Sequence, residues 1–293
     1  MTPGRWLAAA VRTTRPRQWP KNLLVFAAPL AGATAGRVDG LAYAVLAAVA
    51  FGCASAAVYL VNDVVDAERD RRHPVKRHRP VASGALPGSH AVALAVLAAC
   101  CAIAIGVGIG EPLLVAAAAG YLCSSFLYSA RLKHVPFVEM VLVASGFLLR
   151  VLGGAAATHV QPSIWFLLVC GLGALFVTVA KRYAELTSLG ADAARHRPVM
   201  RWYRPGPLRV AQVAVGSLML AMYLLWALGE SDGARMWHLV STLPLAMALG
   251  RFGALTGRRT VRPVEEMITG DGPMIACEVA WLGLFCAGLA AAG

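Results

Sequence analysis

The sequence predicts an all-α integral membrane protein with nine transmembrane helices. Of its 293 residues, 58% are hydrophobic and only 14% are charged, whereas soluble domains have about 25% charged residues. The apolar residues also fall in blocks of about 20, the length that crosses the hydrocarbon core of a bilayer as a helix. Finally, the basic residues gather in alternate connections between these blocks. A soluble fold would not show these three features together.

Nine apolar blocks follow one another along the chain. Many are apolar on all faces, as expected of helices surrounded by lipid and by other helices. Glycine and proline inside several blocks are compatible with helices of a membrane bundle. The blocks cover residues 22–38, 41–62, 89–109, 112–130, 136–157, 162–181, 208–228, 236–256 and 273–292.

The polar segments between the blocks define the rest of a single transmembrane domain, residues 1–293. Residues 1–21 are rich in arginine and have too short an apolar core for a signal peptide, so we expect a cytoplasmic, interfacial segment. The two long connections, residues 63–88 and 182–207, are rich in charged side chains and are expected to lie in the cytoplasm.

The basic residues predict the orientation. Lys and Arg are frequent before the first block and in the long connections, whereas the opposite connections hold only Arg37 and Arg235. By the positive-inside rule the N terminus is cytoplasmic and the C terminus is outside. This pattern accounts for the net charge of +12 without a nucleic-acid partner. We expect a multi-pass plasma-membrane protein with its active site facing the cytoplasm.

An acidic stripe ends the second block. In the segment NDVVDAERD, a rotation of 100° per residue places Asp63, Asp66 and Asp70 on one helix face, next to Asn62. Three carboxylates on one face repel one another unless a cation neutralises them. Oxygen ligands alone favour a hard ion such as Mg²⁺ over Zn²⁺. The alternative is a solvated helix end whose acids are balanced by neighbouring arginines.

Phosphate-binding residues follow the stripe directly. Lys76 and Arg79 can contact phosphate oxygens, and Ser83 offers a hydroxyl beside the open backbone of Gly84. Cations next to a stripe of carboxylates that binds Mg²⁺ indicate a binding site for a diphosphate, with the metal on one side and Lys and Arg on the other.

The motif Asn62-Asp63-x-x-Asp66-x-x-x-Asp70, followed by Lys76-x-x-Arg79-Pro80-x-x-Ser83-Gly84, resembles the UbiA superfamily of intramembrane prenyltransferases. The resemblance covers essentially the whole chain. It implies nine transmembrane helices around a central cavity that opens laterally to lipid. It also implies cytoplasmic cap loops after the second and sixth helices.

Both expected cap loops contain the pentapeptide RHRPV, at residues 77–81 and 195–199. When the two copies are aligned, Lys181 falls opposite Asp63 and Ser188 falls opposite Asp70. The second loop thus keeps the cationic cluster and lacks the acids at these positions. We expect the two copies to face one cavity from equivalent loops.

The second loop departs from the usual pattern of the superfamily. KRYAELTSLGADAARHRPV has only Glu185 and Asp192 as acids, so a second Mg²⁺ cluster is not expected. One metal with additional cations suggests a donor with a phosphate away from its diphosphate. KRYAE and RPRQWPKN, at residues 15–22, are similar to the decaprenyl-phosphate phosphoribosyltransferase branch.

This branch implies transfer of 5-phosphoribosyl from phosphoribosyl pyrophosphate to a polyprenyl (decaprenyl) phosphate, for the lipid-linked arabinose precursor of the cell wall. Mg²⁺ would lie on Asn62, Asp63, Asp66 and Asp70, and the catalytic residues would be these aspartates with Lys76 and Arg79. The lipid phosphate is already anionic, so no general base is needed. The substrate-binding residues would be Arg17, Lys21, Asn22, Asn62, Arg77, Ser83, Tyr128, Lys133, Arg150, Lys181, Arg182, Tyr183, Glu185 and Arg197.

Within that set, Lys181, Arg182 and Tyr183 would hold the 5-phosphate, and Lys21 with Asn22 would form a polar floor. For Arg150, a charge inside an apolar block, we favour a cavity-lining role over a structural partner.

Two other functions are compatible with the class. A prenyltransferase that moves a prenyl chain from prenyl diphosphate to an aromatic or haem acceptor fits the superfamily, although the basic second loop argues against it. A transporter would place its polar site near the bilayer midplane, whereas these polar residues gather at one face. GxxxG spacings permit a homo-oligomer without establishing one.

Overall fold

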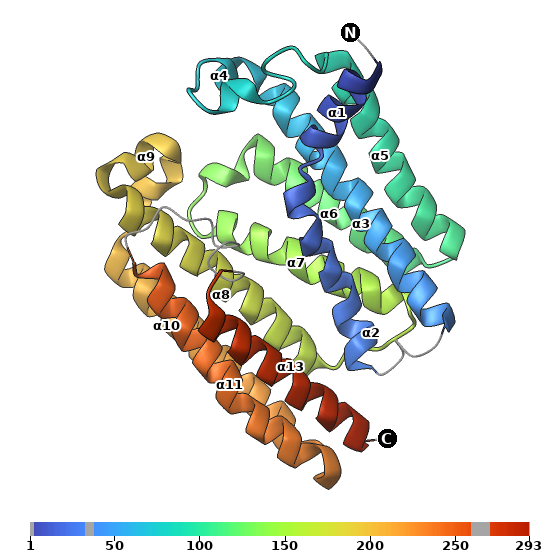
Figure 1. Cartoon of the computed structure of the whole chain (residues 1–293), viewed down its shortest axis with the longest axis vertical. Coiled ribbons are helices and arrows are strands. Elements are labelled where there is room, and N and C mark those ends of the chain that lie inside the picture. The colour runs from blue at the N-terminus through green and yellow to red at the C-terminus, as the bar shows by residue number, and fades with distance from the viewer. Residues whose placement is uncertain (1–2, 33–37, 259–269, 293) are drawn as a thin grey trace. The chain divides into compact units, whose positions relative to one another are not determined.

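The computed structural model describes residues 3–32, 38–258 and 270–292, and in these residues every regular element is a helix (Figure 1). Contacts divide the chain into two compact units. Unit 1 is Met1–Ala130 with Leu149–Pro162, and unit 2 is Arg131–Leu148 with Ser163–Gly293. Each unit is described by itself, and the single domain over residues 1–293 stays a prediction.

Eight helices of the described residues are long and apolar enough to span a membrane, which confirms the all-helical membrane class. They are α3 (Val38–Val65), α5 (Gly88–Ile109), α6 (Pro112–Ala130), α7 (Val138–Ala157), α8 (Ile164–Leu189), α10 (Pro205–Leu228), α11 (Asp232–Thr256) and α13 (Gly272–Ala292).

The span predicted first, over residues 22–38, is not among the eight. Its described part consists of the 3₁₀ helix η1 (Pro16–Phe26) and the short helix α2 (Ala27–Ala31). Pro20 and Pro29 lie inside these elements; because proline has no backbone N–H, it interrupts a regular α-helix. Residues 33–37, including the Arg37 of the charge pattern, lie outside the described residues. The prediction of nine helices is therefore not confirmed.

Unit 1 packs α3 against α5, α6 and η1. Phe51, Leu114 and Tyr121 belong to its main buried cluster, and the N-terminal helix α1 (Pro3–Thr13) adds Ala9 and Ala10 to a second one. A Cβ atom at Gly154 would overlap the backbone carbonyl of Val25 in η1. Only glycine permits this approach, which brings the polar side of η1 close to α7.

Unit 2 packs α10 against α8 and α11 against α13. Phe176 and Phe252 contact each other in one of its buried clusters, with ring centroids 5.6 Å apart.

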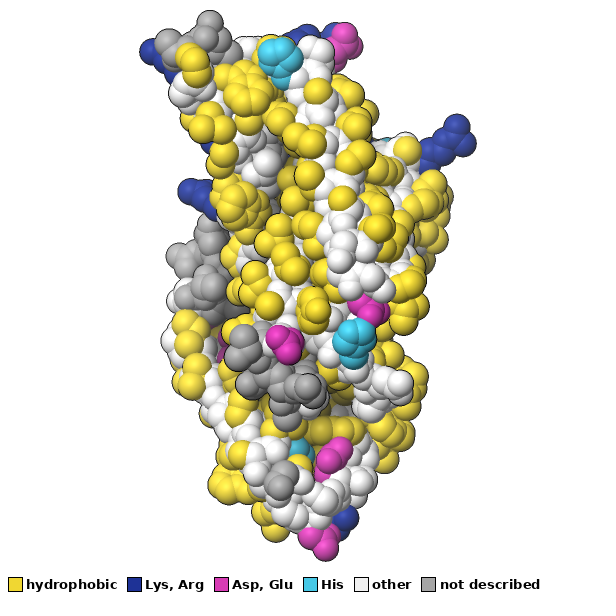
Figure 2. Space-filling model, turned by 90° about the vertical axis from the view of Figure 1, so that its right-hand side faces the viewer, with side chains coloured by type: hydrophobic (Ala, Val, Ile, Leu, Met, Phe, Trp, Pro, Cys, Tyr) yellow, Lys and Arg dark blue, Asp and Glu magenta, His cyan; other side chains and the backbone are white. Residues whose placement is uncertain are grey.

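Hydrophobic side chains cover much of the face drawn in Figure 2. Leu97, Val107 and Leu113 are examples of large apolar side chains that are more than half exposed. Apolar surface of this extent suits contact with lipid.

Candidate active site

The acidic stripe lies where α3 gives way to α4 (Ala67–Arg71), with Asp66 between them. The backbone N–H of Asp66 donates to the carbonyl of Asn62 at 2.9 Å, and that of Asp70 donates to Asp66 at 2.8 Å. These bonds retain the four-residue spacing of an α-helix across the break. The backbone therefore keeps helical spacing from Asn62 to Asp70.

Asp63 and Asp70 converge on one guanidinium. Nη1 of Arg79 lies 3.4 Å from Oδ1 of Asp63 and 2.7 Å from Oδ2 of Asp70. Both aspartates are buried, at 3% and 1% exposure. Asp66 instead pairs with Arg69 of the next turn at 2.7 Å and stays partly exposed. The structure thus brings together two of the three predicted carboxylates, and it brings them to a predicted catalytic arginine.

Arg15 is a further residue of this cluster, and the site predicted from the sequence did not include it. Its Nη2 lies 2.7 Å from Oδ1 of Asp63, and its guanidinium carbon lies 4.8 Å from the centre of the Tyr59 ring. Arg15 has φ 55° and ψ 69°, the left-handed region that non-glycine residues seldom occupy. Its position just before Pro16 hinted at a turn, but no local periodicity indicates a partner 48 residues away.

Lys76 lies in the short 3₁₀ helix η3 (Lys76–His78) and is half-buried. Burial lowers the pKa of Lys76 below its ordinary value, and the nearby Arg79 cation lowers it further. A phosphate group close to Lys76 would offset both effects. The ammonium is thus placed where an anion would stabilise it.

The rest of the first loop is compact. The backbone N–H of Ser83 donates to the carbonyl of Arg79 at 2.9 Å, and Gly84 has φ 79°, which favours glycine. The Ser83 hydroxyl donates to the carbonyl of Pro80 at 3.3 Å. Arg77 is exposed beside them. A tight turn with a hydroxyl and an open backbone therefore follows the two cations.

The donor set fits a hard divalent ion, although the described residues contain no group of three or more His, Cys, Asp or Glu side chains arranged to hold a metal. The Arg79 guanidinium shows that a cation can lie between the Asp63 and Asp70 carboxylates. Mg²⁺ usually takes only one or two carboxylates and completes its shell with water and substrate phosphates. Asp63 and Asp70 could supply such a set once Arg79 moves aside.

A second polar group of unit 1 surrounds Arg150 of α7, which is 5% exposed. Its Nε donates to Oδ1 of Asn22 at 2.8 Å, and its Nη2 donates to Ser55 at 2.9 Å and to the Tyr121 hydroxyl at 3.2 Å. Arg150 therefore has buried hydrogen-bond partners within unit 1, as the structural alternative to a cavity-lining role requires. The cavity-lining role of Arg150 stays a prediction, as does the role of Asn22 in a polar floor. Ser55 and Tyr121 were not predicted because both lie inside apolar blocks.

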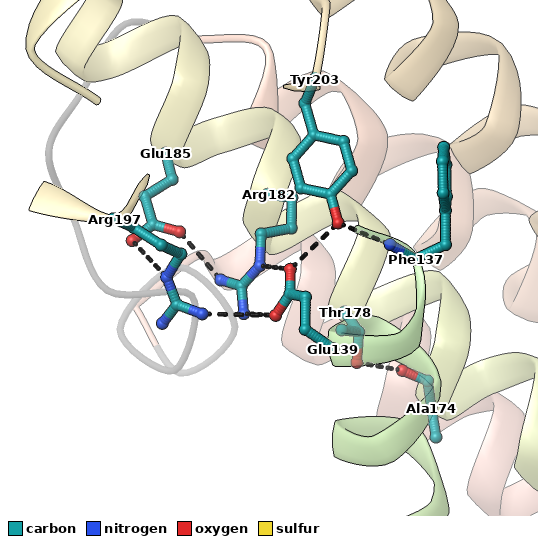
Figure 3. A network of polar contacts seen from close by, with 8 residues as sticks. All are labelled: Phe137, Glu139, Ala174, Thr178, Arg182, Glu185, Arg197 and Tyr203. Carbon is teal, nitrogen blue, oxygen red and sulfur yellow. Dashed lines mark hydrogen bonds and ion pairs between the residues drawn. The ribbon is translucent and has the colours of Figure 1, made fainter. Parts of the chain in front are cut away.

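In unit 2 the predicted phosphate residue Arg182 lies in a buried ion pair (Figure 3). Its Nε lies 2.5 Å from Oε1 of Glu139, its Nη2 lies 2.7 Å from Oε2 of Glu139, and its Nη1 lies 2.8 Å from Glu185. Glu139 is completely buried. Two parallel bonds of this kind form the strongest arrangement of arginine and carboxylate.

Arg197 and Tyr203 join the same network. Nη1 of Arg197 lies 3.3 Å from Glu139, and its Nε lies 3.9 Å from Glu185. The Tyr203 hydroxyl donates to Glu139 at 3.4 Å and accepts from the backbone N–H of Phe137 at 2.9 Å. Glu139 and Tyr203 were not among the predicted site residues, because neither stands next to a motif.

The other predicted residues are spread over both units. Lys181 is exposed, and half-buried Tyr183 lies 5.7 Å from the Arg209 guanidinium carbon. Lys133 lies in the 3₁₀ helix η4 (Leu132–His134). In unit 1, Arg17 is exposed, and the partly exposed residues are Lys21, Asn62 and Tyr128. The shared cavity of the two loops stays a prediction.

The two RHRPV copies have the same local design. Arg79 and Arg197 each precede a proline, and each has an extended ψ angle, 143° and 108°, as a residue before proline prefers. Each folds back onto two carboxylates, with the side chain 28% exposed in both cases. The valine after each proline, Val81 or Val199, is buried. The repeat therefore corresponds to one arrangement used twice.

Comparison with known proteins agrees with this fold and motif. The family model of the UbiA prenyltransferase family matches residues 23–266. The chain belongs to this family of membrane prenyltransferases.

The similar proteins define the branch more narrowly. The decaprenyl-phosphate phosphoribosyltransferase of Mycobacterium tuberculosis is 35% identical, with 98% of this chain and 96% of that protein covered. The proteins of the same description from Mycolicibacterium smegmatis and Corynebacterium glutamicum are each 33% identical, over 96% and 94% of this chain.

Solved structures share the fold. A UbiA homologue from Archaeoglobus fulgidus bound to GPP and Mg²⁺ superposes with a TM-score of 0.71 at 16% identity, covering 97% of this chain and 99% of the other. A digeranylgeranylglyceryl phosphate synthase gives a TM-score of 0.68 at 12% identity, covering 98% of each chain.

Proposed function

We propose that this protein transfers 5-phosphoribosyl from phosphoribosyl pyrophosphate to a polyprenyl phosphate, decaprenyl phosphate in the relatives' name, and releases pyrophosphate. The observation that carries the proposal is identity of 33–35% to decaprenyl-phosphate phosphoribosyltransferases over nearly the whole chain. The basic second loop supports it, because a donor with a separate 5-phosphate needs cations away from the diphosphate. The product would serve as a lipid-linked arabinose precursor of the cell wall.

In this reaction a phosphate oxygen of the lipid forms a bond to ribose C1 while the bond from C1 to the pyrophosphate oxygen breaks. Both electrons of the broken bond leave with pyrophosphate. The attacking phosphate is already an anion, so no side chain has to remove a proton. Catalysis then depends on positioning and on neutralising the charge that develops on the leaving group.

The residues of the first loop suit the second task. Mg²⁺, when bound, would neutralise the leaving pyrophosphate. Asp63 and Asp70 converge from α3 and α4 and would hold the ion, with Asp66 on the exposed side of the stripe. Lys76 and Arg79, released from the carboxylates, would contact the diphosphate oxygens. Arg79 would thus exchange a carboxylate partner for a phosphate partner.

The setting of the reaction is part of the proposal. We infer a plasma-membrane location with both loops in the cytoplasm, because both loops are rich in Lys and Arg whereas the connections on the opposite side hold only Arg37 and Arg235. Phosphoribosyl pyrophosphate is soluble and would reach the loops from that side, while the polyprenyl phosphate would arrive through the bilayer. A homo-oligomer stays a prediction.

The test is a transfer assay with protein purified in detergent. Ribose-labelled phosphoribosyl pyrophosphate and a polyprenyl phosphate are supplied with and without Mg²⁺. Label should enter the lipid phase only with Mg²⁺, and it should be lost in Asp63→Asn and Asp66→Ala. Glu68→Gln, an exposed acid of the same short helix, is the control and should retain transfer.

Prenyl transfer is the competing result of this assay. If no ribose enters the lipid phase and a prenyl diphosphate reacts with an aromatic acceptor, the chain is an ordinary prenyltransferase of the family. The phosphoribosyl proposal would then be wrong.

A further inference from the structure

The second loop obtains its carboxylates differently from the first. Arg79 of the first RHRPV copy contacts Asp63 and Asp70, which precede that copy in the chain. The corresponding positions before the second copy are Lys181 and Ser188, which offer no carboxylate. Arg197 instead contacts Glu139 of α7 and Glu185 of α8. An acid from another helix thus takes the place of the acids that the second copy lacks.

Glu139 contacts the second loop on both sides of a short helix. The 3₁₀ helix η6 (Pro198–Trp202) is preceded by Arg197 and followed by Tyr203, and both side chains contact Glu139. Between them, Val199 and Met200 are buried in the cluster that contains Met140, the neighbour of Glu139. One carboxylate and one apolar cluster therefore dock this segment on α7.

Glu139 also neutralises Arg182. Two guanidiniums, those of Arg182 and Arg197, face the two carboxylates of Glu139 and Glu185 in this network (Figure 3). Without the Glu139 charge, both Arg182 and Arg197 would lose a carboxylate that they share, and Arg182 would lose it in a buried position. Burying an uncompensated charge is costly, so the exposed side of the network, which carries Arg197, would move away.

We propose that Glu139 is a positioning residue that keeps the second loop, and Arg197 in particular, in the position required for binding the phosphate of the donor. The inference rests on the proposed function, in which this loop meets the 5-phosphate. Glu139 is completely buried and does not itself touch substrate in this proposal. It acts through Arg197 and Tyr203.

The test compares Glu139→Gln with the wild type in two measurements. In the transfer assay, KM for phosphoribosyl pyrophosphate should rise on the order of tenfold or more, as for loss of a charge-assisted contact, with KM for the polyprenyl phosphate unchanged. In limited proteolysis, trypsin should cut faster after Arg195 or Arg201, which lie in the second loop on either side of Arg197. Glu139→Asp, which keeps the charge, should bring the donor KM and the cleavage rate part of the way back to their wild-type values.

The matched control is Asp192→Asn. It removes one negative charge from the same loop at an exposed ion pair with Arg195, and it leaves Glu139 intact. Neither KM should change, and the rate of cleavage after Arg201, which lies outside this ion pair, should also stay the same. If Glu139→Gln does not yield folded protein, Tyr203→Phe removes the hydroxyl that bonds to Glu139 and to the backbone N–H of Phe137, and it should raise the donor KM and the cleavage rate by a smaller factor.

The outcomes separate the two proposals. If Glu139→Gln and Tyr203→Phe change neither donor KM nor cleavage, Glu139 does not position the loop and the inference is overturned. An equal rise of KM for both substrates would also overturn it, because that result indicates general destabilisation. If the wild type transfers no ribose, the proposed function fails, and the proteolysis alone still decides whether Glu139 docks the loop.

Discussion

Arg15 and Asp63 form an ion pair of 2.7 Å between the segment before η1 and the C-terminal end of α3. Asp63 is almost completely buried, whereas the Arg15 side chain is 34% exposed. The pair therefore connects the N-terminal segment to the acidic stripe. Arg79 is a further cation within reach of Asp63, at 3.4 Å.

Replacing Arg15 with Gln should destabilise the protein by about 1–3 kcal/mol, because a buried carboxylate loses one of its charged donors. The shift is measured as the midpoint of thermal unfolding in detergent. Arg12→Gln, an exposed arginine of α1, is the control and should leave the midpoint unchanged. Equal midpoints for Arg15→Gln and the wild type would show that the pair contributes nothing to stability.

Arg79→Lys should lower kcat/KM for the donor by about tenfold or more, although the charge is kept. A lysine offers a single ammonium and cannot reproduce the planar guanidinium, and loss of a charged hydrogen bond of ~1.5–3 kcal/mol corresponds to at least a tenfold change in rate. Steady-state kinetics at saturating Mg²⁺ provide the measurement. Undiminished activity would mean that any cation suffices at this position.

The lowered pKa of Lys76 predicts a pH dependence. Below the pKa of the folded state Lys76 carries its charge against burial, so it destabilises the fold there, and this cost disappears as the pH rises toward the ordinary value of 10.5. Donor binding needs the charge and should therefore weaken on the alkaline side earlier than for a free lysine. Lys76→Arg should move that alkaline limb of kcat/KM to higher pH, measured between about pH 7 and 10. Superimposable profiles would rule out Lys76 as the titrating group.

Arg150→Met should lower the stability of the protein more than Arg150→Lys does. Methionine fills the space and leaves Asn22, Ser55 and Tyr121 without their shared donor, and each buried polar group that loses its partner costs about 1–3 kcal/mol. Lysine can restore one of these bonds. Unfolding midpoints of the two variants, compared with transfer activity, separate a structural role from the predicted lining role. Loss of activity in a variant of normal stability would favour the lining role.

Gly154→Ala should prevent normal folding, since its Cβ would overlap the Val25 carbonyl. Gly108→Ala in α5 is the matched control, because a Cβ there meets nothing within 4 Å. The fraction of monodisperse protein after detergent extraction is the readout. Equal yields would show that η1 can move away from α7 at little cost.

The sequence was sufficient for the membrane class because length and apolar composition are local properties. Eight of the nine predicted spans correspond to long helices, whereas the described part of the first lies in η1 and α2, which contain Pro20 and Pro29. From a rotation of 100° per residue, the sequence predicted that Asp63, Asp66 and Asp70 share one helix face. It could not predict that Asp66 turns to Arg69 while the other two share Arg79, because that depends on how the loop folds back.

Contacts between segments that are far apart in the chain could not be predicted from the sequence, for a physical reason. Arg15 pairs with Asp63, and Glu139 with Arg182, over separations of 48 and 43 residues. No helical or strand period links such positions, and Arg15 and Arg182 each have another basic residue close by in the sequence, Arg17 and Lys181. For Arg182 the composition of the loop indicated a phosphate ligand, and the structure shows a buried ion pair with Glu139 and Glu185.

The arginines on Asp63 and Asp70 have a consequence for the biogenesis of the protein. If a newly inserted chain completes its bundle before a metal ion or the phosphoribosyl donor binds, bare buried carboxylates would oppose that assembly. Arg15 and Arg79 serve as internal counter-ions during this period. The protein should therefore survive extraction and storage in chelating buffer, and remain ready to take up its ion afterwards.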